Sequence, residues 1–151
     1  MSCSESYDEA RRPPAPKVAA ELENPVTGRG LKTALYLDTG FDGTILLTSD
    51  LWEKLELGLA ELDEDVYALH GGYLPVRLTP ALARVSICGA WRGLVKVYLH
   101  PLARRALLGR GIVNRLYAYL AGPEGRLVVS RAPLGPGGPP GARNKCQKPG
   151  V

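Results

Sequence analysis

Apolar and polar residues alternate along several short stretches of the chain, as they do in strands that bury one face. Residues 18–23 follow this pattern, and residues 34–37 carry it up to Asp38. The same criteria predict further strands at 44–47, 85–89, 94–98, 117–120 and 126–129. The pattern therefore predicts a mainly β domain.

Two segments have helical features. Ser49 can cap a helix that runs to about Leu57 and turns Trp52 inward. A second, shorter helix is predicted from Gly111 to Leu116.

Glycines mark the predicted hairpins. Gly71 and Gly72 lie between two strand-like stretches, and residues 122–125 (Gly-Pro-Glu-Gly) form the turn of a closing hairpin. An unpaired strand edge in that closing hairpin would be a template for pairing with a second chain.

The two ends of the chain differ from its centre in composition. Residues 1–16 include an Arg-Arg-Pro-Pro-Ala-Pro stretch, which predicts a flexible lead, and residues 131–151 are rich in Gly and Pro, which predicts a disordered basic tail. Residues 17–130 would then form one domain. With 45% apolar and 23% charged residues, the chain has the composition of a soluble globular protein.

The net charge of +4 lies in the predicted tail, where four basic residues have no acidic counterpart. Such a tail could touch RNA or an acidic partner without specificity, so no specific nucleic-acid partner is expected. No apolar run reaches the length of a membrane span, and the first residues do not resemble a signal peptide. We therefore expect a cytoplasmic protein with no membrane partner.

The cysteines and histidines show no metal-binding spacing. Cys3, Cys88 and Cys146 are far apart, and Cys88 is expected to be a small buried residue on a strand. His70 and His100 are isolated in sequence, so neither is assigned to catalysis. No metal or cofactor is expected.

The strongest chemical feature is Asp38-Thr39-Gly40, which comes where an apolar strand must stop. An Asp-x-Gly after a strand is often an ordinary turn. A rival pattern overlaps it, since residues 41–44 (Phe-Asp-Gly-Thr) resemble the opening of haloacid-dehalogenase phosphatases. That family needs a nucleophilic aspartate where this chain has Gly40, so the phosphatase step would lack its nucleophile.

Three features in order resemble the single-domain retropepsin-like aspartic proteases (clan AA, prokaryotic or archaeal type). They are Asp-Thr-Gly at 38–40, the glycine-tipped hairpin around residues 70–77, and Leu-Leu-Gly-Arg at 107–110 before a short helix. The resemblance covers residues 17 to 130. It implies a mainly β, closed-barrel fold with one or two short helices that works as a homodimer.

The resemblance also implies roles for individual residues. Asp38 would be the catalytic carboxylate, Thr39 would hydrogen-bond to its twin in the second subunit, and Gly40 would keep the turn tight. Asp42 falls where retropepsins place an acid that pairs with the arginine of the Gly-Arg motif, here Arg110.

The glycine-tipped hairpin would be the flap that closes over substrate, with Gly71, Gly72 and Tyr73 contacting it. Two positions depart from the family pattern. Retropepsins usually have Ala or Ser after the triplet, where this chain has Phe41, and Asp or Asn after Gly-Arg, where it has Gly111.

Hydrolysis by this route uses two carboxylates that share one proton, one to activate water and one to polarise the scissile carbonyl. The chain contains one Asp-Thr-Gly, so a symmetric homodimer is required for activity. The resemblance thus implies an aspartic endopeptidase acting on an extended peptide or protein. The alternative is an inactive module of the same fold that dimerises or binds a peptide, with Phe41 filling the cleft.

Overall fold

The computed structural model describes residues 2–136. Its strands are β1 (Ser2–Ser6), β2 (Lys17–Glu23), β3 (Gly30–Leu37), β4 (Ile45–Leu47), β5 (Val66–His70), β6 (Leu74–Ile87), β7 (Trp91–Leu99), β8 (Leu107–Leu108), β9 (Tyr117–Ala121) and β10 (Arg126–Ser130). Its helices are α1 (Ser49–Lys54), a 3₁₀ turn at Leu57–Ala60, and α2 (Arg110–Val113).

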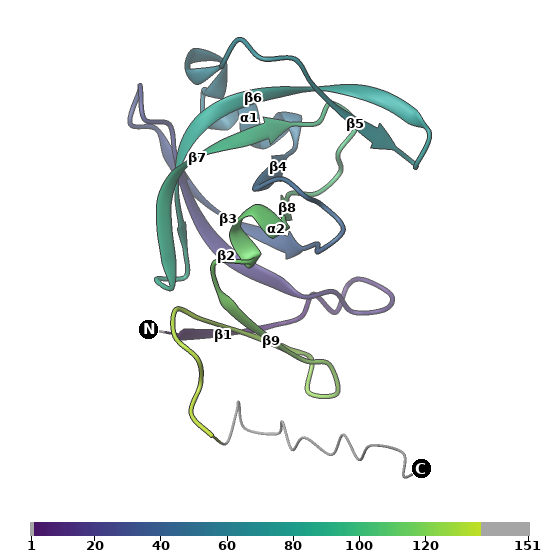
Figure 1. Ribbon diagram of the computed structural model, residues 1–151, viewed down its shortest axis with the longest axis vertical. Helices are drawn as coiled ribbons and strands as arrows, with labels where there is room; N and C mark the ends of the chain where they lie inside the picture. The colour runs from purple at the N-terminus through teal and green to yellow at the C-terminus, as the bar shows by residue number, and fades with distance from the viewer. Residues whose placement is uncertain (1, 137–151) are drawn as a thin grey trace.

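The larger sheet closes on itself. Its strands follow the order β2-β3-β8-β4-β7-β6-β5, and β2 also pairs with β6, so six of them form a ring (Figure 1). The long strand β6 joins three neighbours, because it pairs with β5 at its start, with β7 from Thr79 onward, and with β2 at its end. This confirms the mainly β, closed-barrel fold.

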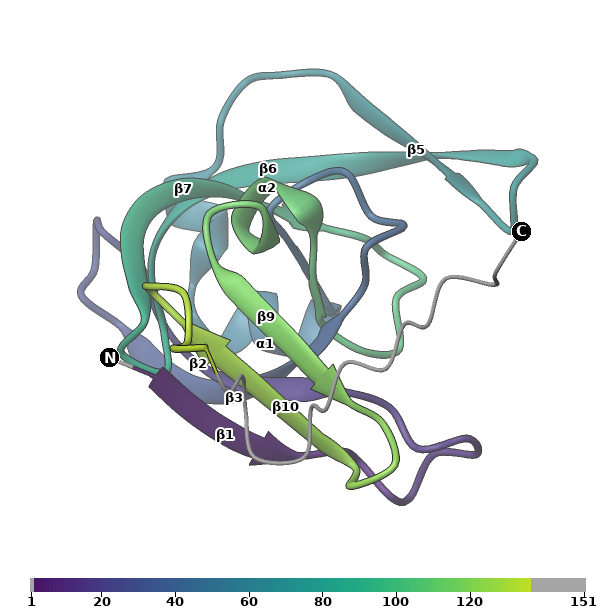
Figure 2. The ribbon, with the colours of Figure 1, turned by 60° about the horizontal axis from the view of Figure 1, so that its bottom comes forward.

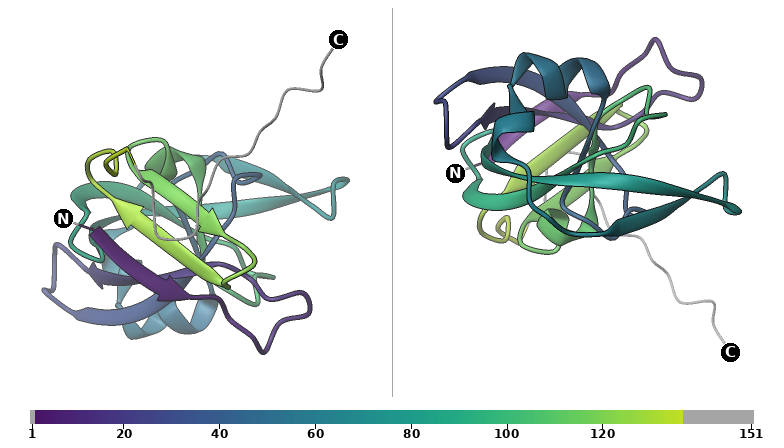
Figure 3. Two further views of the ribbon diagram at one scale, coloured as in Figure 1. Left: turned by 90° about the horizontal axis from the view of Figure 1, so that it is seen from below. Right: turned by 90° about the horizontal axis from the view of Figure 1, so that it is seen from above.

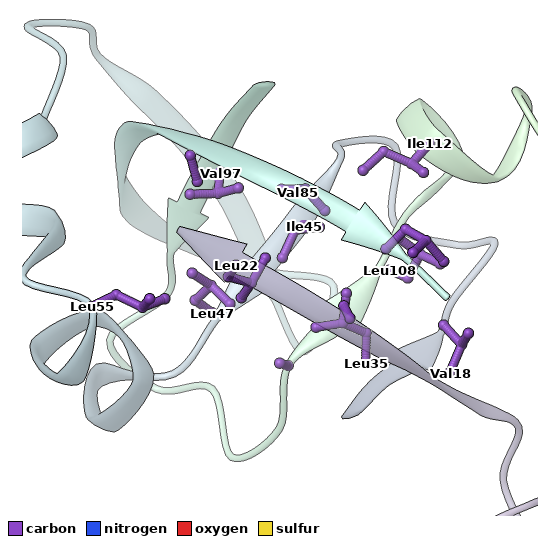
Figure 4. Packing of buried hydrophobic residues seen from close by; sticks show 14 of the residues in the cluster. Val18, Leu22, Leu35, Ile45, Leu47, Leu55, Val85, Val97, Leu108 and Ile112 are labelled. Carbon is purple, nitrogen blue, oxygen red and sulfur yellow. The ribbon is translucent and has the colours of Figure 1, made fainter. Parts of the chain in front are cut away.

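The alternation along the strands produces the core. On β2, Val18, Ala20 and Leu22 are buried, while the residues between them face outward. Figure 4 shows Leu22, Val85 and Val97 from three strands meeting inside the ring, with Leu55 beside them after α1.

The first helix starts one residue earlier than predicted. Thr48 is the N-cap, and its side-chain oxygen accepts a hydrogen bond from the backbone N–H of Leu51. The helix ends at Lys54 instead of near Leu57, because Glu56 adopts a left-handed backbone (φ 54°). The second helix is likewise shorter than expected and ends at Val113.

The N-terminal lead is not a flexible segment over its first residues. Strand β1 pairs antiparallel with β10, and β10 pairs with β9, forming a separate three-stranded sheet (Figure 2). A disulfide joins Cys3 of β1 to Cys88 in the turn after β6. The prediction of a flexible lead was wrong there because strand pairing and a covalent link hold this segment.

Most of the predicted tail, residues 137–151, lies outside the described residues. Within residues 2–136, no helix combines the length and apolar character needed to cross a bilayer.

Candidate active site

Asp38 follows β3 directly and is partly buried. Its backbone N–H donates to the carbonyl of Leu108 (3.0 Å), and its Oδ1 accepts from the N–H of Gly40 (2.9 Å). The carbonyl of Asp38 accepts from the N–H of Phe41 (3.2 Å), which closes the turn. The turn therefore holds the carboxylate in one orientation, while Thr39 and Gly40 stay exposed at its tip.

Strand β8 lies between the two strands that flank this turn. It runs parallel to β3, with Leu37 opposite Leu108, and antiparallel to β4. This arrangement places the chain that leads into Asp38 and the chain that leaves it against the same short strand. The position of the carboxylate thus depends on residues about 70 positions further along the sequence.

Backbone hydrogen bonds extend this junction beyond β8. The N–H groups of Gly109, Arg110 and Gly111 donate to the carbonyls of Thr44 (2.8 Å), Phe41 (2.9 Å) and Gly43 (2.9 Å) in turn. The Leu-Leu-Gly-Arg segment and the Asp-Thr-Gly turn are therefore joined, as their resemblance to the retropepsin pattern suggested.

The ring of Phe41 packs over two glycines of this junction. A Cβ built on Gly43 would lie 2.5 Å from the ring's Cζ, and one on Gly109 would lie 2.5 Å from its Cδ1. Both positions are closed to any larger residue as long as the ring stays there. The large Phe41 side chain therefore fits after the triplet because Gly43 and Gly109 have no side chains beneath its ring.

The expected ion pair between Asp42 and Arg110 is not formed in the structure. Both side chains are exposed, and none of the ion pairs within residues 2–136 joins them. The backbone bond from Arg110 to Phe41 connects the two segments instead. An exposed ion pair would add little to such a link.

The predicted flap is a hairpin of β5 and β6 that extends past the barrel (Figure 3). Gly71 and Gly72 both have positive φ at its tip, 64° and 82°, which explains why glycine suits this turn. Tyr73 beside them is 83% exposed, and Tyr67 and Leu69 on β5 are 64% and 66% exposed. The hairpin therefore offers solvent-facing apolar side chains of the kind that an extended peptide could cover.

Two histidines that are isolated in sequence lie close together in the structure, near the tip of the flap. The rings of His70, at the end of β5, and His100, after β7, lie 5.2 Å apart between centroids. His100 is buried, and its Nδ1 accepts from the N–H of Leu102 (3.0 Å). Burial, and secondarily His70, lowers the pKa of His100. Nothing local in the sequence signals this pair, because 30 residues separate its members.

The Cys3–Cys88 disulfide was also missed, since the two residues are 85 positions apart and one lies in the supposed lead. No group of three or more His, Cys, Asp or Glu side chains in the part of the chain that is described could hold a metal ion.

Comparison with known proteins shows which fold this structure resembles. The structure resembles a retropepsin-like aspartic protease from Rickettsia conorii, with a TM-score of 0.57 and 19% sequence identity over 85% of this chain and 90% of that one. The fold is therefore retropepsin-like. No family model matches the sequence, and no curated protein matches it either.

Proposed function

We propose that the protein is a homodimeric aspartic endopeptidase in which the Asp38 carboxylates of two subunits activate one water molecule. The observation that carries this proposal is the Asp38 turn, hydrogen-bonded to β8 within the Leu-Leu-Gly-Arg segment, in a retropepsin-like fold. Neither a turn nor a fold alone would support it, because a fold hosts many functions.

In the proposed mechanism, the two carboxylates share one proton. The ionised carboxylate takes a proton from water as the oxygen attacks the scissile carbonyl, and the protonated one donates to the carbonyl oxygen. The hydrogen bond from Gly40 would keep each carboxylate facing its twin. Activity would fall when both carboxylates ionise, since neither could then donate.

Two exposed features support pairing with a second copy and capture of a peptide. Strand β9 is an edge of the three-stranded sheet and exposes Tyr117 (45%) and Leu120 (57%), which suits it to contacts between subunits. The flap with Gly71, Gly72 and Tyr73 would close over the extended substrate. The packing of the Phe41 ring on Gly43 and Gly109 favours an open cleft over one that this ring fills.

A cytoplasmic location stays a prediction, and the Cys3–Cys88 disulfide weighs against it. Disulfides of this kind are more common in oxidising compartments.

The proposal is tested by exposing a diverse peptide mixture to the native chain and to Asp38→Asn from pH 3 to 7. Products are read by mass spectrometry, and the oligomeric state is measured by sedimentation. We expect cuts by the native dimer that disappear in a variant that still dimerises. A native dimer that cuts nothing would favour the binding-module alternative, and equal cutting by both chains would point to a different site.

A further inference from the structure

A hollow of about 690 Å³ lies between the end of the flap and the segment that leads to β8. Its polar lining consists of Arg11, His70, His100, Arg104 and Arg105, with no acidic residue among the residues that line it. Guanidinium and imidazole groups come here from three separate parts of the chain, so the fold, and not a local charge run, gathers them.

Two of these arginines have no ionic partner in the structure. Neither Arg104 nor Arg105 forms an ion pair within residues 2–136. Like charges that line one concave surface repel one another, and an anion entering the hollow would relieve that repulsion. The basic lining of the hollow therefore favours the binding of a negatively charged group.

The acid beside Arg11 is already engaged. Asp8 accepts a hydrogen bond from the hydroxyl of Tyr36 and lies 3.9 Å from Arg11. The Tyr36 hydrogen bond, followed by one from the backbone of Ala10, lowers the pKa of Asp8. Asp8 thus neutralises part of the charge of Arg11, whereas the charges of Arg104 and Arg105 are not balanced by it.

The hollow lies close to the candidate active site along β3. The guanidinium groups of Arg11 and Arg105 lie 5.4 Å and 5.3 Å from the centre of the Tyr36 ring. Tyr36 lies on β3 and precedes Asp38 by two residues, so the Cα atoms of the two are at most about 7 Å apart.

The remaining residues that line the hollow are apolar. Leu46 and Leu107, from β4 and β8, lie beside the basic groups, together with Leu102 and Ala103. A ligand that suits this lining has a short apolar stem and a terminal anion. A second hollow, here called the outer hollow, is lined by residues of β2, β3, β6 and β7 and has the same volume. There Glu21 and Glu23 accompany the basic residues, so its charge is mixed.

We propose that the basic hollow binds the carboxylate of an acidic side chain in the peptide substrate, near the bond that Asp38 would cleave. Arginine suits this task because its planar fork matches a carboxylate with two hydrogen bonds. The location of the cut rests on the proposed function, but recognition of the acidic side chain does not.

The test uses the full chain with Asp38→Asn, so that bound peptides stay intact. The probes are fluorescein-labelled, C-terminally amidated decapeptides of one apolar sequence, in which a single Glu is moved through the positions, each with a Gln twin. We expect a Glu preference of about tenfold in Kd at one or two adjacent positions, since hydrogen bonds to charged groups are the strong ones. A free C-terminus on the all-Gln peptide shows whether a terminal carboxylate is recognised in the same way.

The Arg104→Gln/Arg105→Gln double variant should remove the preference. A matched control, Lys32→Gln/Arg92→Gln, removes the same charge from the outer hollow and should keep it. If the first double variant does not fold, the single Arg104→Gln change, at an exposed side chain, should reduce the preference several-fold. The proposal is overturned if no position prefers Glu, if the preference survives loss of both arginines, or if the control removes it equally.

Cleavage by the native chain is measured separately on the same peptides. A Glu preference without any cleavage would support the proposed carboxylate site and contradict the protease proposal. Cleavage without a Glu preference would support the protease proposal and contradict the carboxylate site.

Discussion

The ring of Phe41 lies against Gly109, the glycine that follows β8. The ring also covers Gly43, so one aromatic side chain closes the junction between the Asp38 turn and the Leu-Leu-Gly-Arg segment. The two glycines differ in what else surrounds them. A Cβ on Gly109 would meet the backbone carbonyl oxygen of Gly43 at 2.2 Å, whereas the three atoms nearest to a Cβ on Gly43 all belong to the Phe41 ring.

Gly109→Ala should therefore be strongly destabilising. The backbone oxygen of Gly43 is held by the N–H of Gly111 and cannot withdraw without breaking that bond. We expect a loss of about 3 kcal/mol or more in the free energy of unfolding, at the upper end of overpacking effects. Urea unfolding measures it, with Gly122→Ala as control because a Cβ there meets nothing within 4 Å. Equal stability of the two variants would contradict the described packing.

Gly43→Ala should be destabilising by a smaller amount, about 1–3 kcal/mol, because a side chain can yield more easily than backbone. Its cost should largely disappear in the Phe41→Ala background, where the obstructing ring is absent. The cost of Gly109→Ala should persist in that background. A double-mutant cycle on unfolding free energies measures both couplings. Rescue of Gly109→Ala by Phe41→Ala would show that the ring, not the backbone, is the obstacle.

The Cys3–Cys88 disulfide should stabilise the native chain by about 2–4 kcal/mol, since it closes a long loop in the unfolded state. The Cys3→Ala/Cys88→Ala double variant should lose this amount in urea unfolding. A reducing agent should lower the stability of the native chain to the same level and leave the double variant unchanged. A reductant effect on the double variant would mean that another thiol is involved.

The buried His100 should make stability fall as the pH drops. Its pKa is lower in the folded protein than the ordinary value of 6.5, so the unfolded chain binds more protons below about pH 7. Stability from the neutral ring is therefore fully present above the unfolded pKa and declines toward the folded pKa. His70 adds to this direction, and the other charged residues that line the same hollow, Arg11, Arg104 and Arg105, are all basic.

We expect a slope of at most about 1.4 kcal/mol per pH unit from this one group. Urea unfolding at pH 7.5, 6.5 and 5.5 measures it. His100→Asn keeps an acceptor for the N–H of Leu102 but does not titrate, so its stability should change less over this range. The same slope in both chains would assign the pH dependence to other groups.

Features that depend on near neighbours in the chain could be predicted from the sequence. The alternation of Val18, Ala20 and Leu22 has the period of a strand, and that strand was found with one buried face. Gly71 and Gly72 indicated a tight turn, and both adopt the positive φ that glycine tolerates best. The helix cap was predicted one residue too late, at Ser49, whereas Thr48 caps the helix in the structure.

The candidate site also has features that the sequence predicted and features that only the tertiary structure showed. The sequence by itself determined that a carboxylate would end a strand at Asp38 and that a glycine-tipped hairpin would follow, because turns and strand ends are encoded within a few residues. Only the tertiary structure joined Cys3 to Cys88, brought His70 to His100, seated Phe41 over Gly109 and gathered Arg11 with Arg105 around Tyr36. These contacts link residues 25 to 85 positions apart, and closing such loops is decided by the packing of the whole chain, which no local pattern records.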